Sequence, residues 1–245
     1  MRVGATANQR DVAVRHFGDG REAARAARYE ARSGRVRAAS TATERPRYGA
    51  LTTPYSPIVT THGTTSVRPL EIGDVDSYLR HVGEVDAGSG VDGEPHSHAY
   101  SQSEPFDMEA GRDREVTRWS TDIDDLAWRR AWGLFDQGEL VGHLYLARGM
   151  LRSELHRVHM GMGIRRSHRR QGGGALLLET GIEWARNQPS IDWIDLGVFS
   201  DNPGAHALYA RHGFRVIGRT ADRIRLDGQS LDEILMTLNV ARDNE

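Results

Sequence analysis

Four arginines and three consecutive glycines occur within residues 164–178, between an alternating apolar run and a helical pattern. The arginines are Arg165, Arg166, Arg169 and Arg170. Their guanidinium groups suit phosphate oxygens, because each presents paired N–H donors in one plane. Glycines at 172–174 let the backbone approach a ligand without a Cβ in the way, and the free N–H groups at the helix start face an anion. This order of residues predicts a phosphate-binding site.

Two common phosphate loops do not fit the sequence. A dinucleotide-binding turn has the pattern Gly-x-Gly-x-x-Gly, but Arg166 stands where Gly161-Met-Gly163 would need a third glycine. A nucleoside triphosphate loop ends in Gly-Lys-Ser or Gly-Lys-Thr, and the chain contains no lysine. The remaining pattern, Arg169-x-x-Gly172-x-Gly174, resembles the acyl-CoA pyrophosphate loop of the GNAT acetyltransferase superfamily. Glycine-rich turns between a strand and a helix also occur for packing reasons alone, so a second signal is needed.

The second signal is a motif downstream of the loop. After an apolar run at residues 191–198, the chain reads Asn202-Pro-Gly-Ala-His-Ala-Leu-Tyr209-Ala-Arg-His-Gly213-Phe214. Asn-Pro-Gly is typical of a turn followed by a helix start, and Gly213 ends the helical spacing. This order of Asn, Ala, Tyr and Gly-Phe is similar to the GNAT pattern after its fifth strand. The resemblance covers residues 65–241 and implies an α/β fold, in which helices flank a mixed, twisted central sheet.

Apolar periodicity indicates the remaining elements. Gln137-Gly138 between two alternating runs predicts a hairpin, and residues 86–107 predict a long polar loop. Residues 228–240 are similar to the closing turn and strand of the family. We expect strands over 66–72, 128–136, 139–147, 155–164 and 191–198, and helices over 74–85, 108–119 and 175–187.

The resemblance implies acetyl-CoA as cosubstrate. Its pyrophosphate would bind backbone groups of the glycine loop beside two arginines, and its pantetheine arm would pair like a strand with residues 160–164. Proline and glycine are common in the family where Arg166 and Arg170 stand, but neither difference removes a needed N–H group; the extra arginines could equally be a solvated rim. The implied cofactor-binding residues are Met162, Ile164, Arg169, Arg170, Gln171, Gly172, Gly173, Gly174 and Asn202.

Acetylation of an amine needs a base and an acid. An alkylammonium has a pKa of about 10.4, so a base or a water must take a proton before attack. The resemblance implies that Tyr209 is the acid that protonates the departing thiolate, although at helical spacing it could also be a packing residue. For the base we name Glu154 and His156, with His159, Asp195 or a bound water as alternatives. Strand alternation sends His156 and His159 to opposite faces, so at most one enters the site.

Composition restricts the class of protein. The 245 residues are 38% hydrophobic, with a mean hydropathy of −0.58, and no run approaches the roughly 18 apolar residues of a membrane span. The absence of cysteine excludes a disulfide framework, a zinc–thiolate site and a cysteine nucleophile. Glu94-Pro-His96-Ser-His98 has metal-ligand residue types, but two histidines in a loop do not make a closed site. We therefore expect a cytoplasmic protein without a metal.

The N-terminal part differs from the rest in charge. Residues 1–50 contain 11 arginines and 5 acidic residues, whereas acidic residues exceed arginines in the remainder. An RNA-binding arm would explain this charge, and an organellar presequence is disfavoured by its acidic residues. Because the segment lacks core-forming residues, we favour a disordered extension over 1–62 and a catalytic domain over 63–245.

The sequence thus predicts an N-acetyltransferase that moves an acetyl group from acetyl-CoA to a primary amine by direct attack in a ternary complex. A non-catalytic acyl-CoA sensor is the alternative. The acceptor is either a small-molecule amine or an amine of a protein, with neither a membrane nor a nucleic acid as partner. A homodimer through the late strands is an option that the resemblance suggests.

Overall fold

The computed structural model describes residues 60–62, 65–104 and 106–241 of the chain. The extension expected over residues 1–62 lies outside this part, apart from Thr60–His62. These three residues form strand β1, which pairs antiparallel with β2 (Thr65–Pro69). The sheet therefore includes residues before position 63, and the division of the chain into extension and domain stays a prediction.

Eight strands of the described residues form one mixed sheet, in the order β1-β2-β3-β4-β5-β6-β8-β7. Neighbouring strands are antiparallel except β5 and β6, which are parallel. The mixed sheet predicted from the sequence is thus confirmed. The later strands are β3 (Arg129–Asp136), β4 (Glu139–Ala147), β5 (Arg157–Ile164), β6 (Trp193–Phe199), β7 (Arg215–Leu226) and β8 (Gln229–Asn239).

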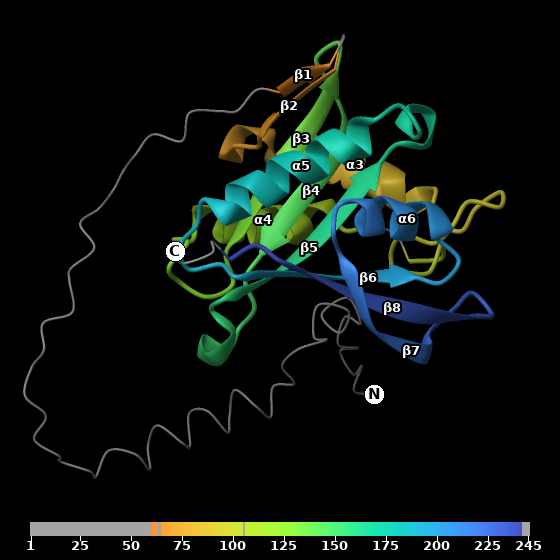
Figure 1. The fold of residues 1–245 in the computed structure, drawn as a ribbon. Coiled ribbons are helices and arrows are strands. Elements are labelled where there is room, and N and C mark those ends of the chain that lie inside the picture. The colour runs from red at the N-terminus through yellow and green to blue at the C-terminus, as the bar shows by residue number, and fades with distance from the viewer. Residues whose placement is uncertain (1–59, 63–64, 105, 242–245) are drawn as a thin grey trace, which may run out of the picture. The chain divides into compact units, whose positions relative to one another are not determined.

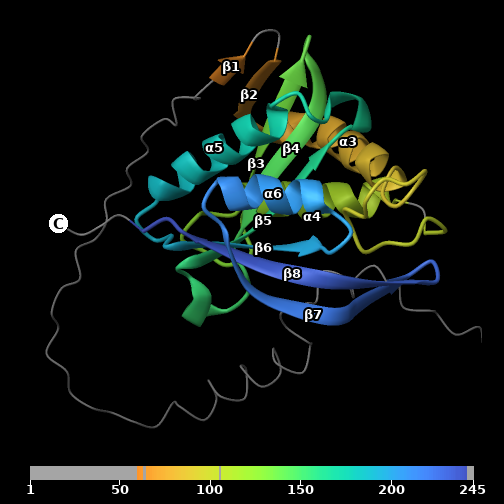
Figure 2. The ribbon, with the colours of Figure 1, turned by 45° about the vertical axis from the view of Figure 1, so that its right-hand side comes forward.

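Helices cover both faces of this sheet. Figure 1 shows two of them, α5 and α6, in front of the strands and the other two, α3 and α4, behind, and Figure 2 shows the same two layers after rotation. Among the described residues, no helix is both long enough and apolar enough to cross a bilayer. The helices are α3 (Val75–Ala87), α4 (Met108–Ser120), α5 (Gly173–Arg186) and α6 (Pro203–Arg211), with 3-10 turns η1 (Ile72–Asp74), η2 (Arg152–Glu154) and η3 (Arg166–His168).

The strand expected over 66–72 ends at Pro69. The Asp74 carboxylate accepts a hydrogen bond from the Glu71 backbone N–H at 2.9 Å and two from the Arg68 guanidinium at 2.7 and 2.8 Å. These bonds hold η1 as a turn at the start of α3. Side-chain capping therefore prevails over the apolar alternation that suggested a longer strand.

Two apolar clusters lie on opposite faces of the sheet. The larger one is under α5 and α6 and includes Leu144, Leu177 and Ile194, each with no exposed area. A Cβ at Gly181 would lie 2.7 Å from Leu144 Cδ2, so glycine is what allows α5 to pack this closely on β4. The smaller cluster is under α3 and α4 and includes Leu79. The sheet is therefore buried on both faces where β3, β4 and β5 meet.

Candidate functional site

Strands β5 and β6 separate from one another part of the way along their length. They pair only at Arg157↔Trp193, Val158↔Ile194 and His159↔Asp195. Beyond this point β5 continues to Ile164, paired with β4, and β6 continues to Phe199, paired with β8. We call the region beyond His159 and Asp195 the divergence. Within it, residues 160–164 have one edge without a strand partner among the described residues, so backbone N–H and C=O groups are available there.

The glycine loop lies at the far end of β5. Gly172 caps α5 in the left-handed region, at φ +88°, and Arg170 is also left-handed, at φ +63°. The first turn of a helix has N–H groups without intrahelical partners, so the backbone around Gly173 and Gly174 can accept an anion. Gln171 donates from its side chain to the Ser167 carbonyl at 2.9 Å, which closes the turn before the helix.

Met162 and Ile164 point to the α5 and α6 face, where both pack against the larger cluster. A Cβ at Gly174 would lie 3.4 Å from Ile164 Cδ1 and 3.8 Å from Met162 Cε. It would also lie 3.1 Å from Leu208 Cδ2, a residue of α6. The end of β5, the start of α5 and helix α6 therefore meet at Gly174, which brings the two separate motifs of the sequence together.

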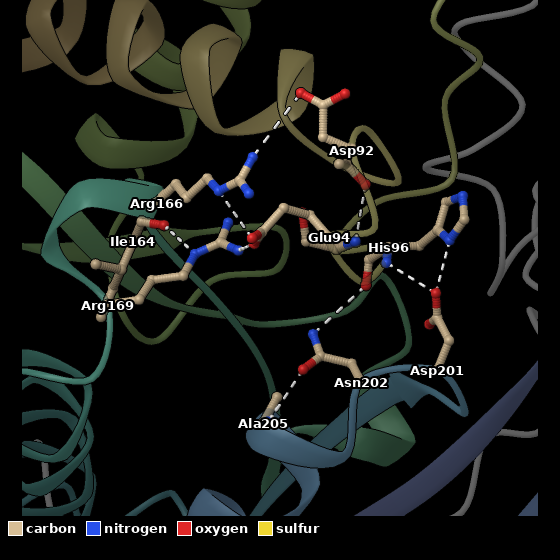
Figure 3. Close-up of polar contacts among 11 residues, drawn as sticks. Asp92, Glu94, His96, Ile164, Arg166, Arg169, Asp201, Asn202 and Ala205 are labelled. Atoms are coloured by element: carbon tan, nitrogen blue, oxygen red, sulfur yellow. Dashed lines mark hydrogen bonds and ion pairs between the residues drawn. The ribbon is translucent and has the colours of Figure 1, made fainter.

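Arg166 and Arg169 share one carboxylate, that of Glu94, as Figure 3 shows. Arg166 Nε lies 2.9 Å from Glu94 Oε1, and Arg169 Nη1 bonds the other oxygen. Arg169 Nε also donates to the Ile164 carbonyl at 2.9 Å. Arg170 is exposed, and its Nη2 lies 3.6 Å from the position of a Cβ at Gly204 in α6.

Asn202 caps helix α6, as the sequence predicted. Its Oδ1 accepts from the Ala205 N–H at 3.1 Å, and its Nδ2 donates to the His96 carbonyl at 3.5 Å. The His96 ring Nδ1 lies 2.7 Å from Asp201 Oδ2, and the His96 backbone N–H donates to the same oxygen at 3.0 Å (Figure 3). Sequence reasoning missed Asp201 and Glu94, because only the fold shows that the 86–107 loop reaches these positions.

Two tyrosines approach the divergence from opposite faces. Tyr209 is 7% exposed within the larger cluster, and burial raises the pKa of its phenol to about 12. Tyr145 packs against the smaller cluster. A Cβ at Gly161 would lie 2.5 Å from the Tyr145 hydroxyl, so the tyrosine ring crosses β5 at this glycine. The nearby Tyr145 phenol also contributes to raising the Tyr209 pKa.

The candidate bases occupy different places. Glu154 ends η2 and His156 directly precedes β5, so both are at the paired end of β5 and β6 and not beside residues 160–164. Asp195 is held by Arg157, whose Nε donates to Asp195 Oδ2 at 2.7 Å, and by a hydrogen bond from a threonine of β8. His159 faces the start of the divergence and keeps access to solvent. Desolvation by the neighbouring strands, with a smaller contribution from an arginine, lowers its pKa, and two nearby carboxylates oppose this shift.

The α3 and α4 face contains a buried ion pair. The Glu115 side chain is 1% exposed, and its two oxygens accept from Arg129 Nη1 at 2.8 and 2.9 Å. The Arg129 guanidinium lies over the Tyr145 ring, 4.0 Å from the centroid. The ion pair therefore packs against one face of the Tyr145 ring.

Two buried histidines lie beside the same tyrosine. The His81 and His143 rings contact edge-to-face at 5.1 Å, and His143 stacks on Tyr145 at 6.4 Å. Burial lowers the pKa of His81 to about 4 and that of His143 well below its usual value. Both rings are therefore neutral at pH 7.

Both histidines of the Glu94–His98 segment already have protein partners. His96 bonds Asp201, and His98 Nε2 lies 2.7 Å from the Asp86 carbonyl. In the part of the chain that the structure describes, no three side chains of metal-binding types are grouped to hold an ion.

Comparison with known proteins gives a family match over part of the chain. Residues 97–214 match the sequence model of the acetyltransferase (GNAT) family. No curated protein matches the sequence.

Solved structures show the same fold at low identity. A Salmonella typhimurium acetyltransferase, yncA, with its cofactor acetyl-CoA is 15% identical with a TM-score of 0.61, over 74% of this chain and 97% of that one. The Escherichia coli ribosomal-protein-S18-alanine N-acetyltransferase is 16% identical with a TM-score of 0.54, over 74% and 97%. The Vibrio cholerae spermidine/spermine N-acetyltransferase SpeG is 17% identical with a TM-score of 0.56, over 73% and 95%.

The residues of the family match include the divergence, the glycine loop and the Asn202 cap. Residues 97–214 thus match the GNAT family of acetyltransferases, and the chain has the fold of solved acetyltransferases.

Proposed function

We propose that the protein transfers an acetyl group from acetyl-CoA to a primary amine, by direct attack of the amine in a ternary complex. One observation carries this proposal: the unpaired edge of β5 at residues 160–164 leads directly into the glycine loop and the start of α5. An extended amide-containing arm can pair with such an edge, and a pyrophosphate can then reach the helix N-terminus.

The cofactor would be held mainly by backbone. Its pyrophosphate would accept from N–H groups of Gln171 to Gly174, beside Arg169 and Arg170. The pantetheine amides would bond the edge between Met162 and Ile164, and Asn202 would contact the same arm from the other side. Arg166 and Arg169 add positive charge at the loop.

Tyr209 would be the general acid. The amine nitrogen attacks the thioester carbonyl carbon, the C–S bond breaks, and the departing thiolate takes a proton from the Tyr209 hydroxyl. Burial raises the pKa of the phenol to about 12, so the hydroxyl is protonated at neutral pH.

His159 is the base that the geometry supports best. The ring lies at the start of the divergence, and its lowered pKa leaves a free lone pair at neutral pH. The Asp195 and Glu233 carboxylates favour its protonated form, so a proton taken from the ammonium is stabilised. Glu154 and His156 stay predictions of the sequence with less support from their positions.

The acceptor that we propose is a primary amine, without a narrower substrate class. The E. coli neighbour acts on a ribosomal protein, and the Vibrio neighbour acts on spermidine or spermine. Such different acceptors on one fold show that the fold does not name the substrate. Homodimer formation and a cytoplasmic location also stay predictions.

Isothermal titration of acetyl-CoA against the full chain tests the proposal, together with a Gly174→Val variant and a thiol-release screen of amines. We expect micromolar binding, which the variant weakens because its side chain would meet Leu208. Binding without turnover of any amine would favour an acyl-CoA sensor instead. A folded protein that binds no acetyl-CoA would overturn the proposal.

A further inference from the structure

The segment between α3 and α4 spans the two walls of the divergence. We call residues 88–104 the strap; it contains turns and bends but no helix or strand. Its side chains reach the glycine loop after β5, the residue before the α6 cap after β6, and the turn between β7 and β8. These contacts are Asp92 with Arg166, Glu94 with Arg166 and Arg169, His96 with Asp201, and Ser101 with Asp227.

Glu94 lies between the two guanidinium groups of the glycine loop (Figure 3). Its side chain is 19% exposed, whereas those of Arg169 and Arg166 are 27% and 61% exposed. Each arginine bonds a different carboxylate oxygen. The carboxylate thus occupies both cationic partners at once, in the manner of a bridging phosphate.

A carboxylate and a phosphate use the same guanidinium donors. A pyrophosphate at the start of α5 would bring two further negative charges next to the Glu94 carboxylate, and like charges at such distances repel. The Glu94 carboxylate and the pyrophosphate therefore cannot both form full-strength ion pairs with Arg166 and Arg169.

We propose that Glu94 is an internal competitor of the cofactor's phosphates, which must leave Arg166 and Arg169 before CoA binds them. This inference rests on the proposed function, because it assumes that the glycine loop takes the pyrophosphate of CoA. It assigns the strap a part in setting cofactor affinity.

The other contacts allow Glu94 to leave while the strap stays in place. His96 is bound through both its ring and its backbone N–H to Asp201. The Ser101 hydroxyl donates to Asp227 Oδ1 at 2.5 Å, and a neighbouring backbone N–H bonds the other oxygen at 3.2 Å. None of these bonds involves the glycine loop, and the Asp92 carboxylate near Arg166 is 80% exposed, so the Glu94 side chain can rotate away while these bonds hold the strap.

Titration calorimetry of CoA and of pantetheine against the wild-type full chain, Glu94→Gln and Glu104→Gln tests the proposal. Glu104 is a matched control, because it is an exposed acid of the same strap whose backbone N–H donates to the Ser101 carbonyl in a turn. Since half-exposed ion pairs contribute modestly, we expect Glu94→Gln to tighten CoA binding by about fivefold. Pantetheine, which lacks the pyrophosphate, should bind equally to all three proteins.

The other outcomes are decisive as well. Unchanged or weaker CoA binding by folded Glu94→Gln would overturn the proposal, since Glu94 would then hold the arginines in their binding positions. An equal gain with Glu104→Gln would also overturn it, because net charge alone would explain the change. If no folded variant binds CoA, the proposed function itself fails, which is distinct from CoA binding that ignores Glu94.

Discussion

The half of the molecule that would bind the cofactor and the half around α3, the strap and α4 are built in different ways. In the cofactor half, β5, the glycine loop and the α6 cap present backbone groups set by short local motifs. The other half instead reaches residues far away in the sequence through its side chains, such as Glu94 with Arg169, 75 positions apart, and His96 with Asp201, 105 positions apart. Local motifs can be read from sequence, whereas distant pairs need the fold.

The largest effect should come from breaking the buried pair of the α4 half. Glu115→Ala leaves the Arg129 guanidinium buried without its main counterion, which should cost about 3–5 kcal/mol of unfolding free energy. Urea denaturation measures this loss. Glu109→Ala, an exposed acid on the same helix, is the control and should change stability by less than about 0.5 kcal/mol. A stable Glu115→Ala protein would mean that this half does not depend on its side-chain pairs.

A second test uses the buried histidines of the same half. The pKa of His81 is lowered to about 4, below the unfolded value of about 6.5. Between these pH values the unfolded chain takes up a proton that the folded state resists, so stability falls as pH falls. The loss for His81 alone should reach about 3 kcal/mol across the window, and none is expected above pH 7.

Urea unfolding at pH 7 and pH 5 checks this expectation. His81→Leu should make the difference between the two pH values smaller than in the wild type, although His143 would keep part of it. An identical pH dependence in both proteins would show that His81 is not the source.

Much of the fold could be predicted because its signals are local. Gln137-Gly138 turned the β3–β4 hairpin as expected, and both residues have positive φ. Helix α6 starts after Asn202 as expected, and the Asn202 side chain accepts a hydrogen bond from the Ala205 N–H. The first strand was predicted too long. The hydrogen bond between Arg68 and Asp74, six positions apart, ends it early, and apolar alternation gives no sign of such a bond.

The candidate site was less predictable for a related reason. Strand alternation places His159 and Asp195 on a face, but it does not say where β5 and β6 stop pairing. The position of that divergence decides which of Glu154, His156 and His159 lies near residues 160–164. The contacts of the strap could not be predicted from the sequence, since no periodicity relates Glu94 to the glycine loop.

A catalytic test compares the two tyrosines that approach the divergence from the two halves. Tyr209→Phe should lower kcat about 100-fold with little change in acetyl-CoA affinity, because only the proton donor is lost. Tyr145→Phe is the matched variant from the opposite face. Steady-state kinetics with an accepted amine distinguish them. A larger loss with Tyr145→Phe would move the acid to the α4 half.

The smallest effect is expected for the base, because a bound water can accept the proton of the ammonium group in place of a side chain. His159→Gln should lower kcat/KM about 30-fold, whereas Glu154→Gln and His156→Gln, at the paired end of β5, should change it less than about twofold. The lowered pKa of His159 places the acidic limb of the pH–rate profile below pH 6.5, since the ring must be neutral to accept a proton. That limb should disappear in His159→Gln. If it persists there and disappears in Glu154→Gln or His156→Gln, the base lies before the divergence, and the sequence alone was the better guide to this residue.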